Sequence, residues 1–362
     1  MSDASWAMTR TDAPSVPDAA AGIGVEAAAE AGPDGDDTGA QLVSLAEIRA
    51  AAARIRGTVV RTPLIPDADL SRAVGGEVRL KCESLQKAGA FKARGACNFL
   101  AQLPEEELAR GVITYSSGNH AQAVAFAAGL RGVRAVVVMP TTAPQVKSDG
   151  ARTLGARVEF AGTTSEHRRV RAEEIAAAEG LVMVPPFDHP WIIAGQGTVA
   201  LEVCQDWPEV DTLLVPIGGG GQMAGCAAAL RRLNPDAAVI GVEPTGAPTM
   251  RRALDAGGPS TLERIDTIAD GLAPTRAGDL TFAHAAAFLD DVVLVEDDDI
   301  RRAAAHLITR RKLVVEYSGA ATVAALLSRR VDATGRKVCA VLSGGNLDTS
   351  LLGEILDVDP AA

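Results

Sequence analysis

Residues 212–230, with the sequence TLLVPIGGGGQMAGCAAAL, contain the pattern that decides the fold. An apolar run comes first, four consecutive glycines follow, and an alanine-rich segment of helical composition completes the unit. A continuous apolar strand followed by a tight turn and a helix is typical of a parallel sheet that helices cover on both faces. A glycine run that opens a helix also presents N–H groups and the positive end of the helix dipole, which suits a phosphate group.

Two further segments repeat this order of apolar run, small-residue turn and alanine-rich segment. SSGNH at 116–120 follows the apolar run 111–115, and SGGN at 343–346 follows the run 338–342. Similar runs alternate with helical segments along the chain, which predicts an α/β protein of mainly parallel sheets with helices on both faces. The remaining predicted strands are 77–81, 135–139, 157–160, 181–184 and 239–242, and the predicted helices include 45–56, 121–130, 165–179, 222–233, 298–312 and 319–330.

The three turns predict a ligand site, because open α/β folds bind their ligands at the carboxyl ends of parallel strands. None of the turns matches a P-loop or a dinucleotide-binding fingerprint, so neither an NTPase nor a dinucleotide enzyme is supported. The alternative is that each turn needs its glycines for backbone geometry alone.

The composition argues against several classes of function. A net charge of −11 and an aromatic content of 3% argue against nucleic-acid binding. The uncharged stretches 111–130 and 212–230 are about as long as membrane spans, but polar turns and glycines interrupt them, so we expect no membrane interaction. Five cysteines without metal-ligand spacing indicate reduced thiols, and no signal peptide is visible, so we expect a cytoplasmic protein.

Residues 1–43 differ in composition from the rest of the chain. Alanine, glycine and proline dominate this segment, and eight acidic residues stand against one arginine. Such a segment cannot bury enough apolar surface to offset the entropy lost on ordering. We therefore predict a disordered acidic tail over residues 1–43.

The segment KCESLQKAGAFKARGA at 81–96 contains a candidate reactive lysine. Lys92 stands where a loop is predicted to give way to a helix, and Lys87 and Arg94 flank it. A helix N-terminus and neighbouring cations both favour the neutral amine, which is the form that Schiff-base chemistry needs. From spacing alone, a surface lysine in a segment of mixed charge is the favoured interpretation.

Six motifs, in this order, resemble the pyridoxal-phosphate enzymes of fold type II, the tryptophan synthase β-like family. The resemblance is closest to the branch of threonine/serine ammonia-lyases and serine racemases, and it covers residues 45 to 352. The motifs are KCESLQKAGAFKARGA (81–96), SSGNHAQAVA (116–125), PFDHPWIIAGQGT (186–198), GGGG (218–221), TIADGLA (267–273) and SGGNLD (343–348).

The resemblance implies a two-domain architecture in which each domain has a mainly parallel sheet. The larger, cofactor-binding domain would comprise residues 44–110 and 189–355, and the smaller domain would comprise residues 111–188. It also implies a homodimer or homotetramer. The chain ends shortly after the last motif, so we expect the smaller catabolic type without a regulatory domain.

The resemblance also assigns the residues that bind the cofactor. Lys92 would hold pyridoxal phosphate covalently and then act as the base and acid at the substrate Cα. Phe91 would lie against the pyridine ring, Asn119 would meet the ring 3-hydroxyl, and Ser343 would hydrogen-bond the ring nitrogen. A hydroxyl at that nitrogen favours β-elimination over reactions that need a long-lived carbanion. The phosphate would be bound by the backbone of Gly218, Gly219, Gly220 and Gly221.

The second motif would bind the substrate. Its turn, made of Ser116, Ser117, Gly118 and Asn119, would hold the substrate carboxylate through N–H groups and hydroxyls. Ser117 is also the second catalytic candidate, since it would face Cα from the side opposite Lys92. His120 and His189 are assigned to the substrate pocket. For each of them the alternative is a packed or orienting side chain that does not bind substrate.

A divalent cation such as Mg²⁺ is a further implication. In relatives the site uses a glutamate in a segment like EPTGAPT at 243–249, where Glu243 and the Ala247 carbonyl are kept. Thr249 replaces a second acidic ligand, so a cation would be bound more weakly. The alternative is a glutamate in a turn that binds no metal.

The expected reaction converts L-threonine or L-serine to a 2-oxo acid and ammonia by α,β-elimination. Ala90 stands where most of the branch has serine, which leaves the choice of hydroxyamino-acid substrate open. Two rivals share the fold, namely a serine racemase and a 3-hydroxyaspartate dehydratase. A third rival is a binding module without catalysis, against which Lys92 and the intact glycine run argue.

Overall fold

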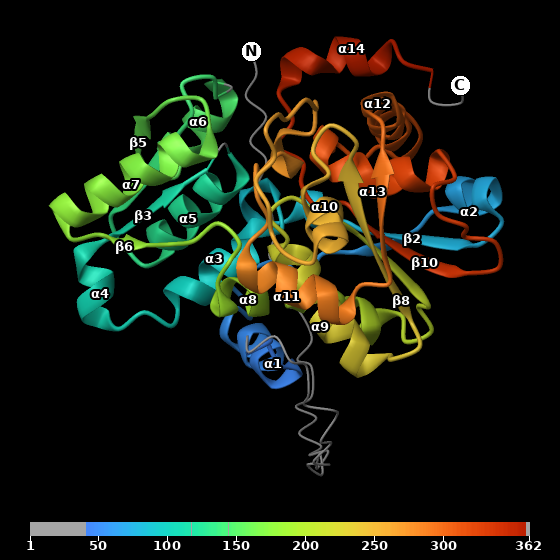
Figure 1. Ribbon diagram of the computed structural model, residues 1–362, viewed down its shortest axis with the longest axis horizontal. Coiled ribbons are helices and arrows are strands. Elements are labelled where there is room, and N and C mark those ends of the chain that lie inside the picture. Colours follow the sequence, from blue (N-terminus) through green and yellow to red (C-terminus); the bar gives the residue numbers. More distant parts are fainter. Residues whose placement is uncertain (1–40, 117, 144, 360–362) are drawn as a thin grey trace, which may run out of the picture. The chain divides into compact units, whose positions relative to one another are not determined.

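The strands gather into two sheets, and helices lie on both faces of each (Figure 1). The computed structural model describes residues 41–116, 118–143 and 145–359. Within these residues the sheets are mainly parallel, so the predicted fold class is confirmed. Among the described residues, no helix is both long enough and apolar enough to cross a membrane.

The larger sheet has six strands, and only its first edge strand runs antiparallel to its neighbour. The last strand of the chain, β10, is inserted between β2 and β7, which lie far apart in the sequence. In spatial order the strands are β1 (Leu64–Pro66), β2 (Glu77–Lys81), β10 (Lys337–Val341), β7 (Thr212–Pro216), β8 (Ala238–Pro244) and β9 (Asp291–Val295).

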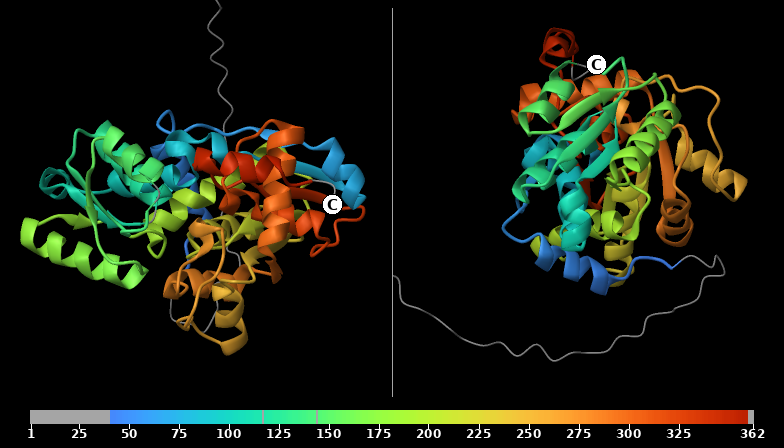
Figure 2. Two further views of the ribbon diagram at one scale, coloured as in Figure 1. Left: turned by 90° about the horizontal axis from the view of Figure 1, so that it is seen from above. Right: turned by 90° about the vertical axis from the view of Figure 1, so that its left-hand side faces the viewer.

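The smaller sheet has four parallel strands. Alternate residues of β4 enter two separate cores: Val137 packs with residues of α3 and α5, whereas Val136 packs with residues of α7. Both faces are therefore dry, which explains why β4 is apolar throughout. Figure 2 shows the helices beside this sheet from two further directions. In spatial order the strands are β5 (Arg157–Phe160), β4 (Ala135–Met139), β3 (Val112–Tyr115) and β6 (Val182–Met183).

The described α-helices number fourteen, and the first begins with a capping box between Ser44 and Glu47. They are α1 (Leu45–Arg54), α2 (Ala68–Val74), α3 (Lys92–Leu100), α4 (Glu105–Arg110), α5 (Asn119–Leu130), α6 (Gln145–Thr153), α7 (Ser165–Glu179), α8 (Pro190–Asp206), α9 (Gly221–Leu233), α10 (Thr249–Ala256), α11 (Asp279–Phe288), α12 (Asp297–His306), α13 (Tyr317–Leu327) and α14 (Leu352–Leu356).

Three details differ from the sequence prediction. The helix predicted over 298–312 is α-helical to His306 and continues as a π-helical turn, Leu307–Arg311. The strands β1 and β9 were not predicted. Val43, assigned to the tail, is buried in the core, and its N–H donates to His284 Nε2 at 2.9 Å. Residues 1–40 of the predicted tail lie outside the described residues. The domain division stays a prediction.

Helix α3 is anchored by a buried arginine. The Arg94 guanidinium is fully buried and forms a two-pronged pair with Glu83 at 2.8 Å for both contacts. It also binds Glu202 of α8 at 2.7 Å, and Lys81 at the end of β2 binds the same glutamate at 2.6 Å. These pairs join α3 to β2 and α8, and thereby fix the helix at whose first residue Lys92 lies.

We predict that Arg94→Met destabilises the apoprotein by about 3–5 kcal/mol, because Glu83 would remain buried without its counter-ion. Urea unfolding measures this free energy. The matched control is Arg169→Met, since Arg169 is partly exposed and pairs with Glu166 and Glu173 at the surface. The control should lose less than about 1 kcal/mol, and equal losses in both variants would contradict the anchoring role.

Candidate active site

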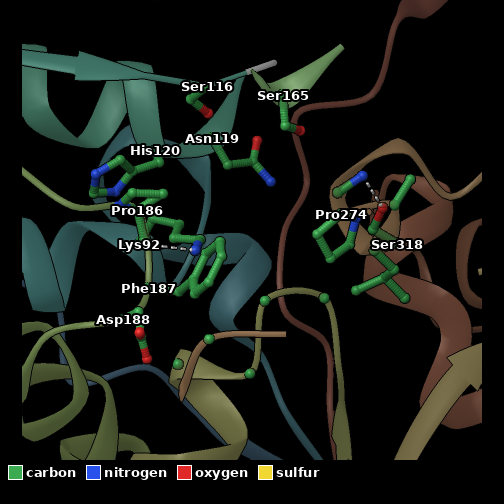
Figure 3. Close-up of a pocket in the computed structure, with 18 of the residues that line it drawn as sticks. Lys92, Ser116, Asn119, His120, Ser165, Pro186, Phe187, Asp188, Pro274 and Ser318 are labelled. Carbon is green, nitrogen blue, oxygen red and sulfur yellow. Dashed lines mark hydrogen bonds between the residues drawn. The ribbon is translucent and has the colours of Figure 1, made fainter. Parts of the chain in front are cut away.

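A cavity of about 380 Å³ lies where the three small-residue turns meet (Figure 3). The turns follow β3, β7 and β10, so the smaller sheet contributes one and the larger sheet contributes two. Ser116, Gly218 and Ser343, one from each turn, line the cavity. The predicted ligand position at the carboxyl ends of the strands is thus realised as a single hollow between the two sheets.

Lys92 extends its amine into this cavity (Figure 3). Its Nζ donates to the Pro186 carbonyl at 2.7 Å and lies 5.1 Å from the centre of the Phe91 ring. Burial lowers the pKa of Lys92 to about 8. The predicted direction of this shift is correct, but its cause differs: Lys87 is exposed, and Arg94 points into its own carboxylate pairs.

Backbone pairing brings the lysine segment and the last turn together. The Phe91 N–H donates to the Ser343 carbonyl at 3.1 Å, and Ala90 forms an antiparallel bridge with Gly344. These contacts join residues more than two hundred positions apart and place Ser343 beside the first residue of α3. The Ser343 hydroxyl is buried and lies 3.4 Å from the Ser318 carbonyl.

The glycine turn opens α9 and admits no larger side chain. Gly220 has φ of 93°, which lies in the left-handed region. A Cβ at Gly219 would lie 2.2 Å from the Phe187 ring, and one at Gly218 would lie 2.7 Å from the Gly271 carbonyl. The close approach of backbone and neighbours therefore requires glycine here, while the N–H groups of the first helical turn remain directed along the helix axis.

The turn after β3 lies across the cavity from Ser318 and Pro274 (Figure 3). The Gly118 N–H donates to Ser116 Oγ at 3.2 Å, which shapes the turn that begins α5. Ser117 lies outside the described residues, so its catalytic assignment stays a prediction.

His120 lines the cavity from the first turn of α5. Burial and the nearby charge of Lys92 lower the pKa of His120 to about 3. Its Nε2 lies 3.3 Å from the Val184 carbonyl, and its Nδ1 has no hydrogen-bond partner among the described residues. The imidazole is therefore neutral at ordinary pH, which excludes it as a cationic carboxylate ligand.

Two residues hold the Asn119 side chain: Glu316, which directly precedes α13, and Asn346, which follows β10. Asn119 Nδ2 donates to Glu316 Oε1, and Asn119 Oδ1 accepts from Asn346 Nδ2 at 2.9 Å. Asn346 also donates to the Ala88 carbonyl at 2.9 Å, close to the lysine segment. Asn119 is thereby fixed at the cavity wall.

Three further charged residues, Lys147, Asp270 and Glu316, were not assigned to the site from the sequence. Lys147 on α6 pairs with Asp270, and its Nζ lies 3.5 Å from Glu316 Oε2. Both Lys147 and Asp270 line the cavity. Asp270 lies inside the TIADGLA motif, which was the available signal for it, whereas nothing in the sequence around Glu316 marks that glutamate as part of the site.

The described contacts of His189 are structural, and its assignment to the substrate pocket stays a prediction. His189 is not among the described residues that line the cavity. Its Nδ1 accepts from the Trp191 N–H at 3.1 Å and caps α8, whose first residue is Pro190. Its ring packs edge-on against Phe99 with 4.9 Å between centroids. Helix capping and packing thus account for this side chain.

The predicted cation site at Glu243 is not supported. Both carboxylate oxygens already accept backbone N–H groups, one from Met250 at 2.7 Å and one from Arg251 at 2.9 Å. Burial raises the pKa of Glu243 to about 7. Ala247 is buried beside this turn, but no group of three or more His, Cys, Asp or Glu in the described part of the chain could hold a metal ion. Glu243 instead caps the start of α10.

The residues around the cavity fit pyridoxal phosphate. The glycine turn offers a helix N-terminus that no side chain obstructs, which suits the phosphate. A buried lysine with a lowered pKa suits the aldehyde, and the neutral hydroxyl of Ser343 suits a ring nitrogen. The individual contacts assigned to Phe91, Asn119 and Ser343 stay predictions.

Comparisons with known proteins agree with this chemistry. A family model described as pyridoxal-phosphate dependent enzyme matches residues 55–344. The L-threonine ammonia-lyase of Thermotoga maritima is 42% identical over 87% of this chain and 79% of its own length. A serine racemase of Oryza sativa is 39% identical over 90% of this chain and 97% of its own length.

Solved structures show the same likeness. The maize serine racemase superimposes with a TM-score of 0.83 at 38% identity, covering 87% of this chain and 97% of its own. The architecture, the residues of the cavity and the family model all indicate the same family. The chain belongs to the pyridoxal-phosphate-dependent enzymes of fold type II.

Proposed function

We propose that this enzyme is an ammonia-lyase that converts small L-β-hydroxyamino acids, L-threonine and L-serine, to 2-oxo acids and ammonia. The observation that carries the proposal is the buried Lys92 amine opposite the SSGNH turn, in a cavity sized for a cofactor and a small amino acid. The 42% identity to an L-threonine ammonia-lyase supports the same reaction.

Bound pyridoxal phosphate would supply the electron sink for cleavage at the substrate Cα and Cβ. Lys92 of this chain would move the proton: its amine would take the proton from Cα while the bond from Cβ to the hydroxyl breaks, and the hydroxyl would leave with a proton as water. A pKa of about 8 keeps a useful fraction of neutral amine at neutral pH. Ser343 contributes a hydroxyl instead of a carboxylate, which favours elimination.

The substrate carboxylate is bound by the turn that opens α5. Ser116 supplies a hydroxyl there, and the first turn of α5 supplies N–H groups and the positive end of its dipole. Because His120 is neutral, it holds the turn without adding charge. Tyr115 and Phe187 contribute aromatic surface to the cavity wall.

A serine racemase is the second candidate, favoured by the 39% identity to a serine racemase over most of the chain. It would need Ser117 to deliver a proton to the face of Cα opposite Lys92. The 3-hydroxyaspartate dehydratase reaction differs only in the substrate side chain. Product analysis separates these reactions, since D-serine, oxaloacetate and 2-oxobutanoate or pyruvate are different products.

We further infer a cytoplasmic homodimer or homotetramer. All five cysteines are free thiols, and burial raises the pKa of each, which suits a reducing compartment. Light scattering on the purified holoenzyme measures the assembly directly.

The function is tested with a panel of L-threonine, L-serine, D-serine and 3-hydroxyaspartate. We expect 2-oxo acid formation to be fastest with L-threonine or L-serine. Lys92→Ala should lose at least about 10²-fold of this activity, because it removes the proton-transferring amine. Formation of D-serine as the main product would replace the lyase by the racemase.

The pKa of Lys92 predicts how cofactor attachment depends on pH. Only the neutral amine reacts with the aldehyde, so the attachment rate of the apoenzyme should rise with pH and level off above about 8. Stopped-flow absorbance with excess pyridoxal phosphate measures this rate. A rate that keeps rising to about pH 10.4, the ordinary lysine value, would contradict the lowered pKa.

Gly219→Ala should weaken cofactor retention by about tenfold or more, because a Cβ would collide with Phe187 at the phosphate turn. Gly258→Ala is the matched control, since a Cβ there meets nothing within 4 Å. Dialysis titration measures retention of the cofactor. Equal affinity in the Gly219 variant and the wild type would remove the glycine turn from the phosphate site.

A further inference from the structure

A chain of polar contacts connects helix α6 to the substrate turn. We propose that Lys147 is a positioning residue that holds the SSGNH turn in its substrate-binding geometry, acting through Glu316 and Asn119. The proposal rests on the proposed function, because it concerns how that reaction's substrate carboxylate is received.

Lys147 packs directly beneath the turn. A Cβ added to Gly118 would lie 2.5 Å from Lys147 Cδ, so the lysine stem occupies the space under the turn backbone. The side chain of Lys147 is only 6% exposed. Its position therefore limits how far Gly118 and the start of α5 can move toward α6.

The ammonium of Lys147 lies between two carboxylates of very different exposure. The Glu316 side chain is 4% exposed, whereas the Asp270 side chain is 42% exposed. Water can solvate Asp270 without help, but the buried Glu316 depends on Lys147 for its compensating charge. Burial raises the pKa of Glu316, and Lys147 opposes that rise.

The carboxylate of Glu316 in turn orients Asn119. Asn119 is the first residue of α5, and its Nδ2 donates to Glu316 Oε1. Without Lys147, Glu316 would have to take up a proton or move toward water. Either change would alter the acceptor that Asn119 needs, and the amide at the entrance of α5 would turn away.

The test compares four variants of the holoenzyme. They are Lys147→Met, Glu316→Gln, the double variant, and Arg152→Met as the control. Arg152 lies on the same helix α6, but it is partly exposed and pairs with Asp149 at the surface. It should leave turnover unchanged.

Lys147→Met should raise the KM for L-threonine by about 10-fold to 100-fold while kcat changes much less, because a displaced turn costs substrate positioning. In the Glu316→Gln background the same change should alter KM by less than about threefold, since a neutral amide needs no counter-ion. A full effect of Lys147→Met in both backgrounds would overturn the proposal. If Lys147→Met alone fails to fold, the double variant is compared with Glu316→Gln, and a difference in KM greater than about threefold would still overturn the proposal.

Hydrogen exchange gives a readout that does not depend on turnover. The backbone N–H of Gln122 donates to the Gly118 carbonyl at 3.0 Å, so its exchange reports on the first turn of α5. Exchange over residues 119–124 should be faster in Lys147→Met and unchanged in Arg152→Met. Unchanged exchange in Lys147→Met would refute the positioning role. If the wild type does not deaminate hydroxyamino acids, the proposed function fails while this measurement still decides on Lys147.

Discussion

The site depends on the neutralisation of one buried guanidinium. Arg94 is enclosed by Glu83 and Glu202, and these pairs fix α3 against β2 and α8. Lys92 lies only two residues earlier, at the start of the same helix. Because Arg94 makes the ion pairs that anchor α3, Lys92 needs none. Its amine is buried against the Pro186 carbonyl, and burial lowers the pKa of Lys92 to about 8.

Neither sheet contains a complete site. The larger sheet supplies the glycine turn and Ser343, and the smaller sheet supplies the SSGNH turn. The polar contacts of Asn119 with Glu316 and Asn346 cross the cavity wall and connect these contributions. The turns of the two sheets therefore meet at one cavity and are connected by polar side chains.

Local periodicity predicted much of the fold. The run 77–81 and the helix 165–179 have the bounds that the structure gives to β2 and α7, because their apolar spacing and caps are local signals. Strand β1 was missed because three residues carry too little pattern, and β9 because acidic residues flank it. The π-helical turn after His306 has no local signal that was recognised.

Cavity-lining residues could be predicted where one short sequence motif contains both the reactive residue type and its structural setting, as for Lys92 and the glycine run. It was not predictable where a contact joins distant residues: Lys147 and Glu316 are 169 positions apart. Glu243 shows the opposite case, in which a residue type suited to a metal ligand accepts backbone N–H groups at the start of a helix. Distinguishing the two uses requires knowing which backbone N–H groups lie nearby.

The central place of β10 has a consequence for synthesis on the ribosome. Strand β10 fills the gap between β2 and β7, and the backbone after it pairs with residues 89–91. Until residues 337–345 have left the exit tunnel, β2 and β7 lack their shared neighbour and the Lys92 segment lacks its backbone partner. The nascent chain thus cannot assemble the cofactor pocket early, and maturation of the enzyme follows, rather than accompanies, translation of most of its length.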